Sequence, residues 1–193
     1  MSQLIQKAIL KMVSLHDGQV RKGDNKTPYA VHPLEVAIIL SRYTPSEELI
    51  AAALLHDALE DTGYTFEQLS EEFGEGVAYF VSLLTEDKST QDYWQRKINS
   101  LNKANEHKTA KVIKSIDTLV NMKDLVTLIQ EKGEKAWQVF NGSKEMKVNY
   151  FKTILESWKE EFPPELLVNY VSALKDLEHA ENQATGSTLG FNQ

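Results

Sequence analysis

The sequence predicts an all-α fold, and three features of its pattern indicate this. Apolar residues recur at helical spacing along most of the chain, whereas the alternation typical of half-buried strands is nearly absent. Helix-start signals precede several of these stretches, with Ser46, Thr65 and Ser143 as candidate N-caps. With 193 residues, 41% of them hydrophobic and 25% charged, the chain can bury the core of one domain. We therefore expect a single bundle of about ten helices.

The expected helices follow the apolar periodicity in chain order. They cover residues 2–16, 33–42, 46–59, 65–72, 75–84, 90–105, 108–125, 126–131, 134–140, 143–160 and 164–180. Pro33 suits the first position of its helix, so His32 is expected just before that helix. Thr65, with Gln68 three residues later, is the one candidate cap that completes a capping box.

The segments between these helices carry breaker and loop residues. Residues 18–28 form a polar loop rich in glycine and charge, and Pro163 and Pro164 separate the last two helices. From Asn182 onward the composition predicts a loosely ordered tail. We expect one domain over residues 1–181 and a C-terminal tail over residues 182–193.

The bulk composition argues against several classes of protein. A net charge of −7 argues weakly against nucleic acid as a main partner. The chain has no apolar run of the roughly 18–20 residues that cross a membrane, and its N-terminus lacks a signal-peptide pattern. Because cysteine is absent, a cytoplasmic protein is the simplest expectation. The sequence leaves a homo-oligomer possible.

Charge is distributed unevenly along the chain. Residues 43–87 contain eleven Asp or Glu and no Lys or Arg, whereas residues 88–152 contain thirteen Lys or Arg and seven acids. One interpretation is solvated helix faces of unlike sign. The other is a cleft whose acidic wall holds a metal and whose basic wall holds phosphate. The composition leaves both interpretations open.

A cluster of polar side chains follows the apolar run at residues 49–55. His56, Asp57, Glu60 and Asp61 place one imidazole and three carboxylates within six residues. Because burying an uncompensated charge costs several kcal/mol, a divalent metal is a direct way to offset this cluster. His56 and Asp57 are adjacent candidate ligands. Glu60 and Asp61 come one helical turn later, a position suited to handling the water on a metal.

Two further ligands are available elsewhere in the chain. His32 lies before the second expected helix, and Asp117 interrupts the inward stripe of the helix expected over residues 108–125. Two histidines and two aspartates with open coordination positions suit Mn²⁺, Fe²⁺ or Zn²⁺ in hydrolytic chemistry.

The motifs of this chain, taken in order, resemble a known family. The order His, His-Asp, Asp is the signature of the HD metal-dependent phosphohydrolase superfamily. Residues 3–155 are similar in register to the hydrolase domain of RelA/SpoT proteins, and the chain length resembles that of the free-standing small alarmone hydrolases. The motifs that carry this resemblance are Gly18-Gln19-Val20-Arg21-Lys22, Pro28-Tyr29-x-x-His32-Pro33, His56-Asp57-x-x-Glu60-Asp61-Thr62, Phe73-Gly74, Leu84-Thr85-x-x-Lys88 and Asp117-x-Leu119-x-Asn121.

The resemblance implies an all-α HD domain and a reaction. The expected activity is removal of the 3′-diphosphate of ppGpp or pppGpp, which gives GDP or GTP and pyrophosphate, with Mn²⁺ as the expected metal cofactor. His32, His56, Asp57 and Asp117 would hold the metal. Glu60 and Asp61 would act on the water and the leaving group, and the sequence does not divide these two roles between them.

The resemblance also suggests contacts to a nucleotide substrate. Arg21 and Lys22 would lie against the base and the phosphates, where a guanidinium can stack on a purine. Asn121 would contact ribose or phosphate, and Tyr150 would lie near the nucleotide, although core packing is nearly as good an interpretation for Tyr150. Cations expected to bind the diphosphate, or else to be ordinary surface residues, are Lys88, Arg96 and Lys97.

Two departures from the family pattern keep other substrates open. Thr118 stands where the family commonly has Arg or Lys, and Met146 stands where the small hydrolases tend to carry a basic residue. The alternatives are the same chemistry on (p)ppApp or on a nicotinamide dinucleotide phosphate. A non-catalytic nucleotide sensor is a further alternative, but it would not need the Glu60-Asp61 pair. His16, His107 and His179 lack carboxylate neighbours at metal spacing, so we interpret them as ordinary polar histidines.

Overall fold

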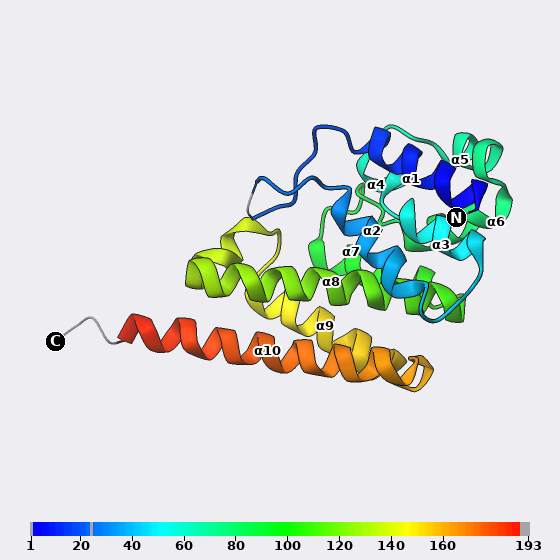
Figure 1. Ribbon diagram of the computed structural model, residues 1–193. Helices are drawn as coiled ribbons and strands as arrows, with labels where there is room; N and C mark the ends of the chain where they lie inside the picture. Colours follow the sequence, from blue (N-terminus) through cyan, green and yellow to red (C-terminus); the bar gives the residue numbers. More distant parts are fainter. Residues whose placement is uncertain (1, 24, 190–193) are drawn as a thin grey trace. The chain divides into compact units, whose positions relative to one another are not determined.

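The all-α prediction is confirmed for the part of the chain that the computed structural model describes, residues 2–23 and 25–189. Within these ranges extended pairing is limited to one isolated antiparallel bridge between Val20 and Pro28. The helices, drawn in Figure 1, are α1 (Gln3–Leu15), α2 (Val31–Leu40), α3 (Glu47–Leu54), α4 (Ala58–Asp61), α5 (Phe66–Phe73), α6 (Glu75–Leu84), α7 (Tyr93–Ala104), α8 (Lys108–Lys132), η1 (Gly133–Val139), α9 (Lys144–Trp158), η2 (Lys159–Glu161) and α10 (Pro164–Leu189).

The chain divides into two compact units. The N-terminal unit comprises Met1–Arg21 and Lys26–Asp117, and the C-terminal unit comprises Lys22–Asn25 and Thr118–Gln193. The expected domain over residues 1–181 stays a prediction. No helix in the described ranges combines the length and the apolar character needed to cross a lipid bilayer.

Helix α3 lies at the centre of packing in the N-terminal unit. It packs against α1, α2 and α6, and α6 in turn packs against α5 and α7 (Figure 1). Three consecutive alanines, Ala51 to Ala53, are fully buried in α3, and Leu54 is almost so. Small side chains on a buried helix let neighbouring helices approach closely on several faces. The residues that follow α3 are therefore fixed in the interior of this unit.

The candidate N-caps are confirmed. The side-chain oxygens of Ser46, Thr65 and Ser143 accept hydrogen bonds from the backbone N–H groups of the third helical residues of α3, α5 and α9. Thr65 also forms the predicted capping box, because Gln68 Oε1 accepts from the Thr65 N–H at 3.0 Å. These bonds satisfy N–H groups that have no partner inside the helix.

Helix α2 begins earlier than predicted. Its first residue is Val31, so His32 is the second helical residue and Pro33 the third. The N–H groups of Val31 and His32 bond to the carbonyls of Pro28 and Tyr29, three residues back, at 3.1 and 3.0 Å. This tight first turn extends the helix backward. Pro33 is tolerated because an N–H in the first turn has no intrahelical partner to lose.

The predicted helix over residues 46–59 is wrong in one respect, because it is interrupted at residues 55–57 between α3 and α4. Conversely, the helices predicted over 108–125 and 126–131 are one helix, α8, because Leu125, Val126 and Leu128 are buried and continue its apolar pattern. Gly133, with φ +58°, follows the last residue of α8. The segment predicted over 134–140 is a 3₁₀-helix, η1.

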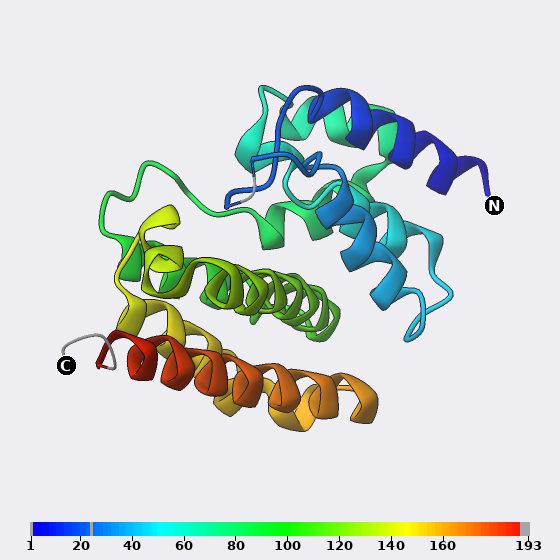
Figure 2. The same ribbon diagram turned by 60° about the vertical axis from the view of Figure 1, so that its left-hand side comes forward.

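The C-terminal unit is built on α9 and α10, which lie side by side (Figure 2). The Tyr170 hydroxyl donates to the Phe151 carbonyl at 3.1 Å, and Tyr170 is fully buried. Helix α10 continues past residue 180 and ends at Leu189. Residues 190–193 of the predicted tail lie outside the described residues.

Candidate metal centre

The interruption between α3 and α4 shapes the candidate centre. The Leu55 N–H still bonds to Ala51 and Ala52, and the Ala58 N–H bonds back to the Leu55 carbonyl at 2.9 Å. In a continuous helix the Ala53 carbonyl would accept from the backbone four residues later. Here that carbonyl accepts from His56 Nδ1 at 2.8 Å. This bond places the proton of a neutral imidazole on Nδ1, so Nε2 carries the lone pair.

Four side chains of the N-terminal unit converge at this point. His56 Nε2 lies 3.1 Å from Asp57 Oδ2 and 3.8 Å from Asp117 Oδ1. His32 Nε2 lies 3.7 Å and 3.1 Å from the same two oxygens. Both histidines are 2% exposed, and the Asp57 and Asp117 side chains are 14% and 11% exposed. The four predicted metal ligands are therefore brought together from α2, the residues 55–57 turn and α8.

The two carboxylates of this cluster favour a positive charge beside them. Burial opposes protonation of His56, yet the Asp57 carboxylate beside it, with a smaller effect from Asp117, raises the pKa of His56 to about 9. Burial also opposes ionisation of Asp57, but His56 holds the Asp57 pKa well below its usual range. At neutral pH the metal-free His56 therefore carries a proton, and its buried Nε2 faces Asp57 Oδ2 and Asp117 Oδ1. A divalent cation that displaced this proton would meet an imidazole nitrogen and two carboxylates, a donor set that suits it.

Glu60 and Asp61 lie on the short helix α4, three and four residues beyond Asp57. Burial is the main cause that raises the pKa of Glu60 to about 7. Its Oε2 accepts from the Glu86 N–H at 3.0 Å. Asp61 Oδ1 is paired with the Lys88 ammonium, which also lies 3.9 Å from Glu60 Oε1. A carboxyl group whose pKa is near neutrality can both take up and release a proton at the pH of the cell.

Tyr29 is a site residue that sequence reasoning missed. Its hydroxyl donates to Asp57 Oδ2 at 2.7 Å and lies 3.2 Å from Asp61 Oδ2. Burial, reinforced by these two carboxylates, raises the pKa of Tyr29, so the hydroxyl stays protonated. The available signal was the spacing Tyr29-x-x-His32, which is one of the motifs above but carried no assigned role.

A buried charge cluster beside the candidate ligands was also missed. Glu86 is 7% exposed and contacts Lys97 Nζ at 2.5 Å and Arg96 Nε at 3.4 Å. Lys114, 5% exposed, lies 3.4 Å from Asp117 Oδ2 and 3.9 Å from Glu86 Oε1. The two cations predicted to bind a diphosphate on α7 are therefore paired with a protein acid. In the sequence nothing distinguishes Glu86 from an ordinary loop carboxylate.

The other predicted substrate contacts are spread over both units. Arg21, in the N-terminal unit, lies over the Tyr29 ring with its guanidinium carbon 5.5 Å from the centroid. Lys22, Asn121 and Tyr150 belong to the C-terminal unit; Lys22 is exposed, Asn121 half-buried and Tyr150 buried. Their contacts to a nucleotide stay predictions.

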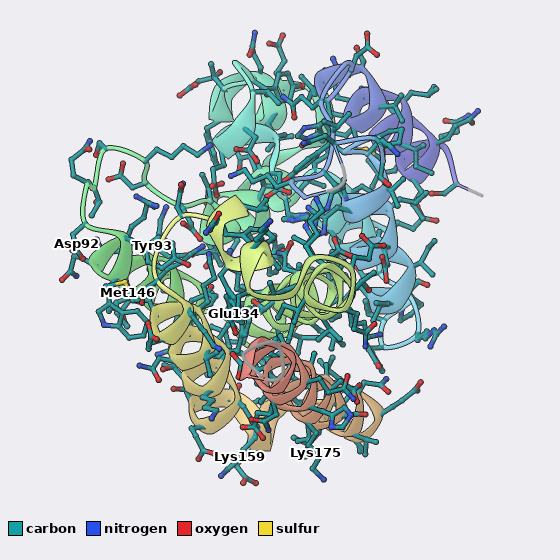
Figure 3. The ribbon with its side chains drawn as sticks, turned by 90° about the vertical axis from the view of Figure 1, so that its left-hand side faces the viewer. Asp92, Tyr93, Glu134, Met146, Lys159 and Lys175 are labelled. Carbon is teal, nitrogen blue, oxygen red and sulfur yellow. The ribbon has the colours of Figure 1, made fainter. Side chains whose placement is uncertain are left out.

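The two departures from the family pattern differ in exposure. Thr118 is 2% exposed, whereas Met146 is 38% exposed and lies at the surface of α9 (Figure 3). An arginine in place of Thr118 would have to bury its charge, so threonine fits this position as it stands.

Residues 11–140 match the HD domain family. This chain belongs to the HD domain family. A similar protein from Danio rerio, named guanosine-3′,5′-bis(diphosphate) 3′-pyrophosphohydrolase MESH1, is 38% identical over 138 residues, which cover 66% of this chain and 77% of that protein. The Xenopus tropicalis protein of the same name is 38% identical over 112 residues, which cover 57% of this chain and 63% of the relative.

The HD fold is also shared with solved structures. A metazoan ortholog of SpoT, described as hydrolysing ppGpp, matches with a TM-score of 0.65 at 27% identity, over 97% of both chains. HD hydrolases are metal-dependent, and in this HD chain the His/Asp cluster supplies a donor set for a metal.

Proposed function

We propose that this protein hydrolyses the 3′-diphosphate of ppGpp or pppGpp to give GDP or GTP and pyrophosphate. The observation that carries the proposal is the convergence of two imidazoles and two carboxylates beside Glu60, whose pKa is about 7. The MESH1 proteins and the SpoT ortholog support the same substrate, because their names describe ppGpp hydrolysis.

His32, His56, Asp57 and Asp117 would hold one divalent metal, because the donor set mixes imidazole nitrogen and carboxylate oxygen. We propose Mn²⁺, the metal that the family resemblance implies. A metal bound there would acidify water and neutralise charge that develops on the phosphoryl oxygens. It would also take the place of the proton on His56 Nε2, which is buried between two carboxylates.

The acids of α4 would carry the proton transfers. Water attacks the phosphorus bonded to the 3′-oxygen, a new P–O bond forms and the bond from phosphorus to the 3′-oxygen breaks. We assign uptake of the water proton to Glu60, because its raised pKa makes it the stronger base of the buried carboxylates. The departing 3′-oxygen takes up a proton to become the ribose hydroxyl. Asp61 would assist either the deprotonation of the water or the protonation of the departing 3′-oxygen.

Positively charged side chains would bind the anionic substrate. Lys88 is held by Asp61, and Arg96 and Lys97 are held by Glu86. A diphosphate entering the site would compete with these carboxylates for the same cations. Arg21, Lys22, Asn121 and Tyr150 are the proposed contacts to the rest of the nucleotide. Cytoplasmic localisation, a homo-oligomer, and the absence of nucleic-acid and membrane partners stay predictions.

A nucleotide panel tests the substrate. Purified protein with Mn²⁺ is given ppGpp, pppGpp, ppApp and NADPH, and the products are separated by ion-exchange chromatography. We expect ppGpp to be consumed first, with equal amounts of GDP and pyrophosphate. Faster loss of ppApp or NADPH would overturn the substrate assignment, and tight binding without turnover would favour a sensor.

Metal analysis of the same preparation tests the centre. His56→Ala and Asp117→Ala should lose stoichiometric metal and turnover together, whereas His179→Ala, which changes an exposed histidine on α10, should lose neither. Full metal content in both His56→Ala and Asp117→Ala would show that the metal lies elsewhere.

A further inference from the structure

The Tyr29 hydroxyl lies between a proposed metal ligand and a proposed acid. It donates to Asp57 Oδ2 at 2.7 Å, and Asp61 Oδ2 lies 3.2 Å from the same oxygen. Asp57 Oδ2 is also the oxygen that faces both imidazoles. A hydroxyl has one proton, so the shorter contact takes the hydrogen bond while its dipole also faces the second carboxylate.

The Tyr29 ring is held rigidly enough to orient that hydroxyl. The His16 ring stacks on it at a centroid distance of 4.8 Å, and the Arg21 guanidinium lies over it at 5.5 Å. The Tyr29 N–H donates to the Gln19 carbonyl at 2.9 Å. His16, which the sequence left as an ordinary polar histidine, is 3% exposed and therefore part of this support.

The same loop is tied to the end of α4 by a second route. Gln19 Nε2 donates to the Asp61 carbonyl at 3.3 Å, and Gln19 Oε1 lies 2.8 Å from His16 Nδ1. The isolated bridge between Val20 and Pro28 closes the loop on itself. Tyr29 thus contacts the side chain of Asp61, and Gln19 contacts its backbone. Tyr29 and Gln19 are themselves joined by a backbone hydrogen bond.

We propose that Tyr29 is a positioning residue that holds Asp57 in its ligand orientation and keeps Asp61 at a fixed place beside it. This inference rests on the proposed metal-dependent function of the His/Asp cluster. Hydrogen-bond partners of metal ligands orient those ligands, and their loss typically lowers metal affinity or activity by about 10–100-fold. Tyr29 acts through the two carboxylates and needs no contact of its own with the substrate.

The Tyr29→Phe variant tests the proposal because it removes one oxygen and keeps the ring between His16 and Arg21. Titration of metal-free protein with Mn²⁺ should show an affinity about 10–100-fold weaker than in the wild type. The visible spectrum of the Co²⁺-loaded variant should also change, since it reports ligand geometry. In ppGpp hydrolysis, kcat should fall while KM stays within about twofold, because the substrate contacts are unchanged.

Tyr64→Phe is the matched control. The Tyr64 hydroxyl also donates to a carboxylate, Glu72 Oε2 at 2.6 Å, but neither residue belongs to the proposed centre. Its Mn²⁺ affinity, Co²⁺ spectrum and kcat should match those of the wild type. Any loss specific to Tyr29→Phe is therefore a property of the proposed centre and not of losing a tyrosine–carboxylate bond.

Each result separates the inference from the function on which it rests. Wild-type Mn²⁺ affinity and Co²⁺ spectrum in Tyr29→Phe would overturn the role of Tyr29 and leave the metal centre intact. Loss of the thermal unfolding transition together with metal binding would also overturn it, because Tyr29 would then be a structural residue. Failure of the wild type itself to bind metal would instead refute the proposed function.

Discussion

Glu60→Gln should stabilise the metal-free protein at alkaline pH while abolishing its turnover. The Glu60 side chain is 17% exposed, and burial raises its pKa from the ordinary value of 4.5 to about 7. The folded state therefore holds this proton more tightly than the unfolded state. Glutamine keeps an oxygen that can accept from the Glu86 N–H but carries no charge to bury.

The pH range in which Glu60→Gln stabilises the protein follows from the upward direction of the Glu60 pKa shift. Below pH 4.5 the carboxyl is protonated in both states, so burial carries no charge penalty. As the pH rises from 4.5 to 7, the unfolded state releases the proton first and stability falls. Above pH 7 the full penalty is present, and a pKa change of this size corresponds to roughly 3 kcal/mol. For a chain of this length that is roughly 6–12 °C in Tm.

The assay is thermal and urea unfolding of both proteins in EDTA at pH 4.5 and pH 8.5. The variant should be the more stable protein at pH 8.5 and close to the wild type at pH 4.5. Glu72→Gln is an opposite control: despite partial burial, Lys11 and Tyr64 lower the Glu72 pKa, so removing that charge should destabilise the protein. Equal stability of the wild type and Glu60→Gln at pH 8.5 would refute the reasoning.

Three further predictions test binding, buried charge and capping. Lys22→Ala should raise KM for ppGpp more than it lowers kcat, the pattern of lost uniform binding; a fall in kcat alone would contradict this assignment. Lys114→Met leaves the Glu86 and Asp117 carboxylates with one cation fewer, so urea unfolding of the metal-free protein should show a loss of about 3–5 kcal/mol. Thr65→Ala removes a complete capping box and should destabilise the protein by about 1 kcal/mol without changing kcat.

Local rules predicted the parts of this protein that depend on neighbouring residues in the chain. The all-α class, the caps at Ser46, Thr65 and Ser143, and the start and end of α6 follow from periodicity and hydrogen-bonding side chains. Apolar periodicity predicted a helix boundary wrongly where a side chain competes for a backbone hydrogen bond. The apolar pattern over residues 46–59 predicts one helix. In the structure, however, the Ala53 carbonyl accepts a hydrogen bond from the His56 imidazole, and the helix ends there.

The sequence by itself determined the residue types of the candidate centre, because imidazole and carboxylate after an apolar helix are hard to explain without a cation. Only the tertiary structure decided how they are supported. The placement of Tyr29 between Asp57 and Asp61, and of Glu86 against Lys97, joins residues 11 to 32 positions apart. The same packing buries Glu60 and moves its pKa toward neutrality. Burial and the distance to neighbouring charges depend on the folded structure. The sequence therefore identifies the ionisable groups, whereas the fold determines their pKa values.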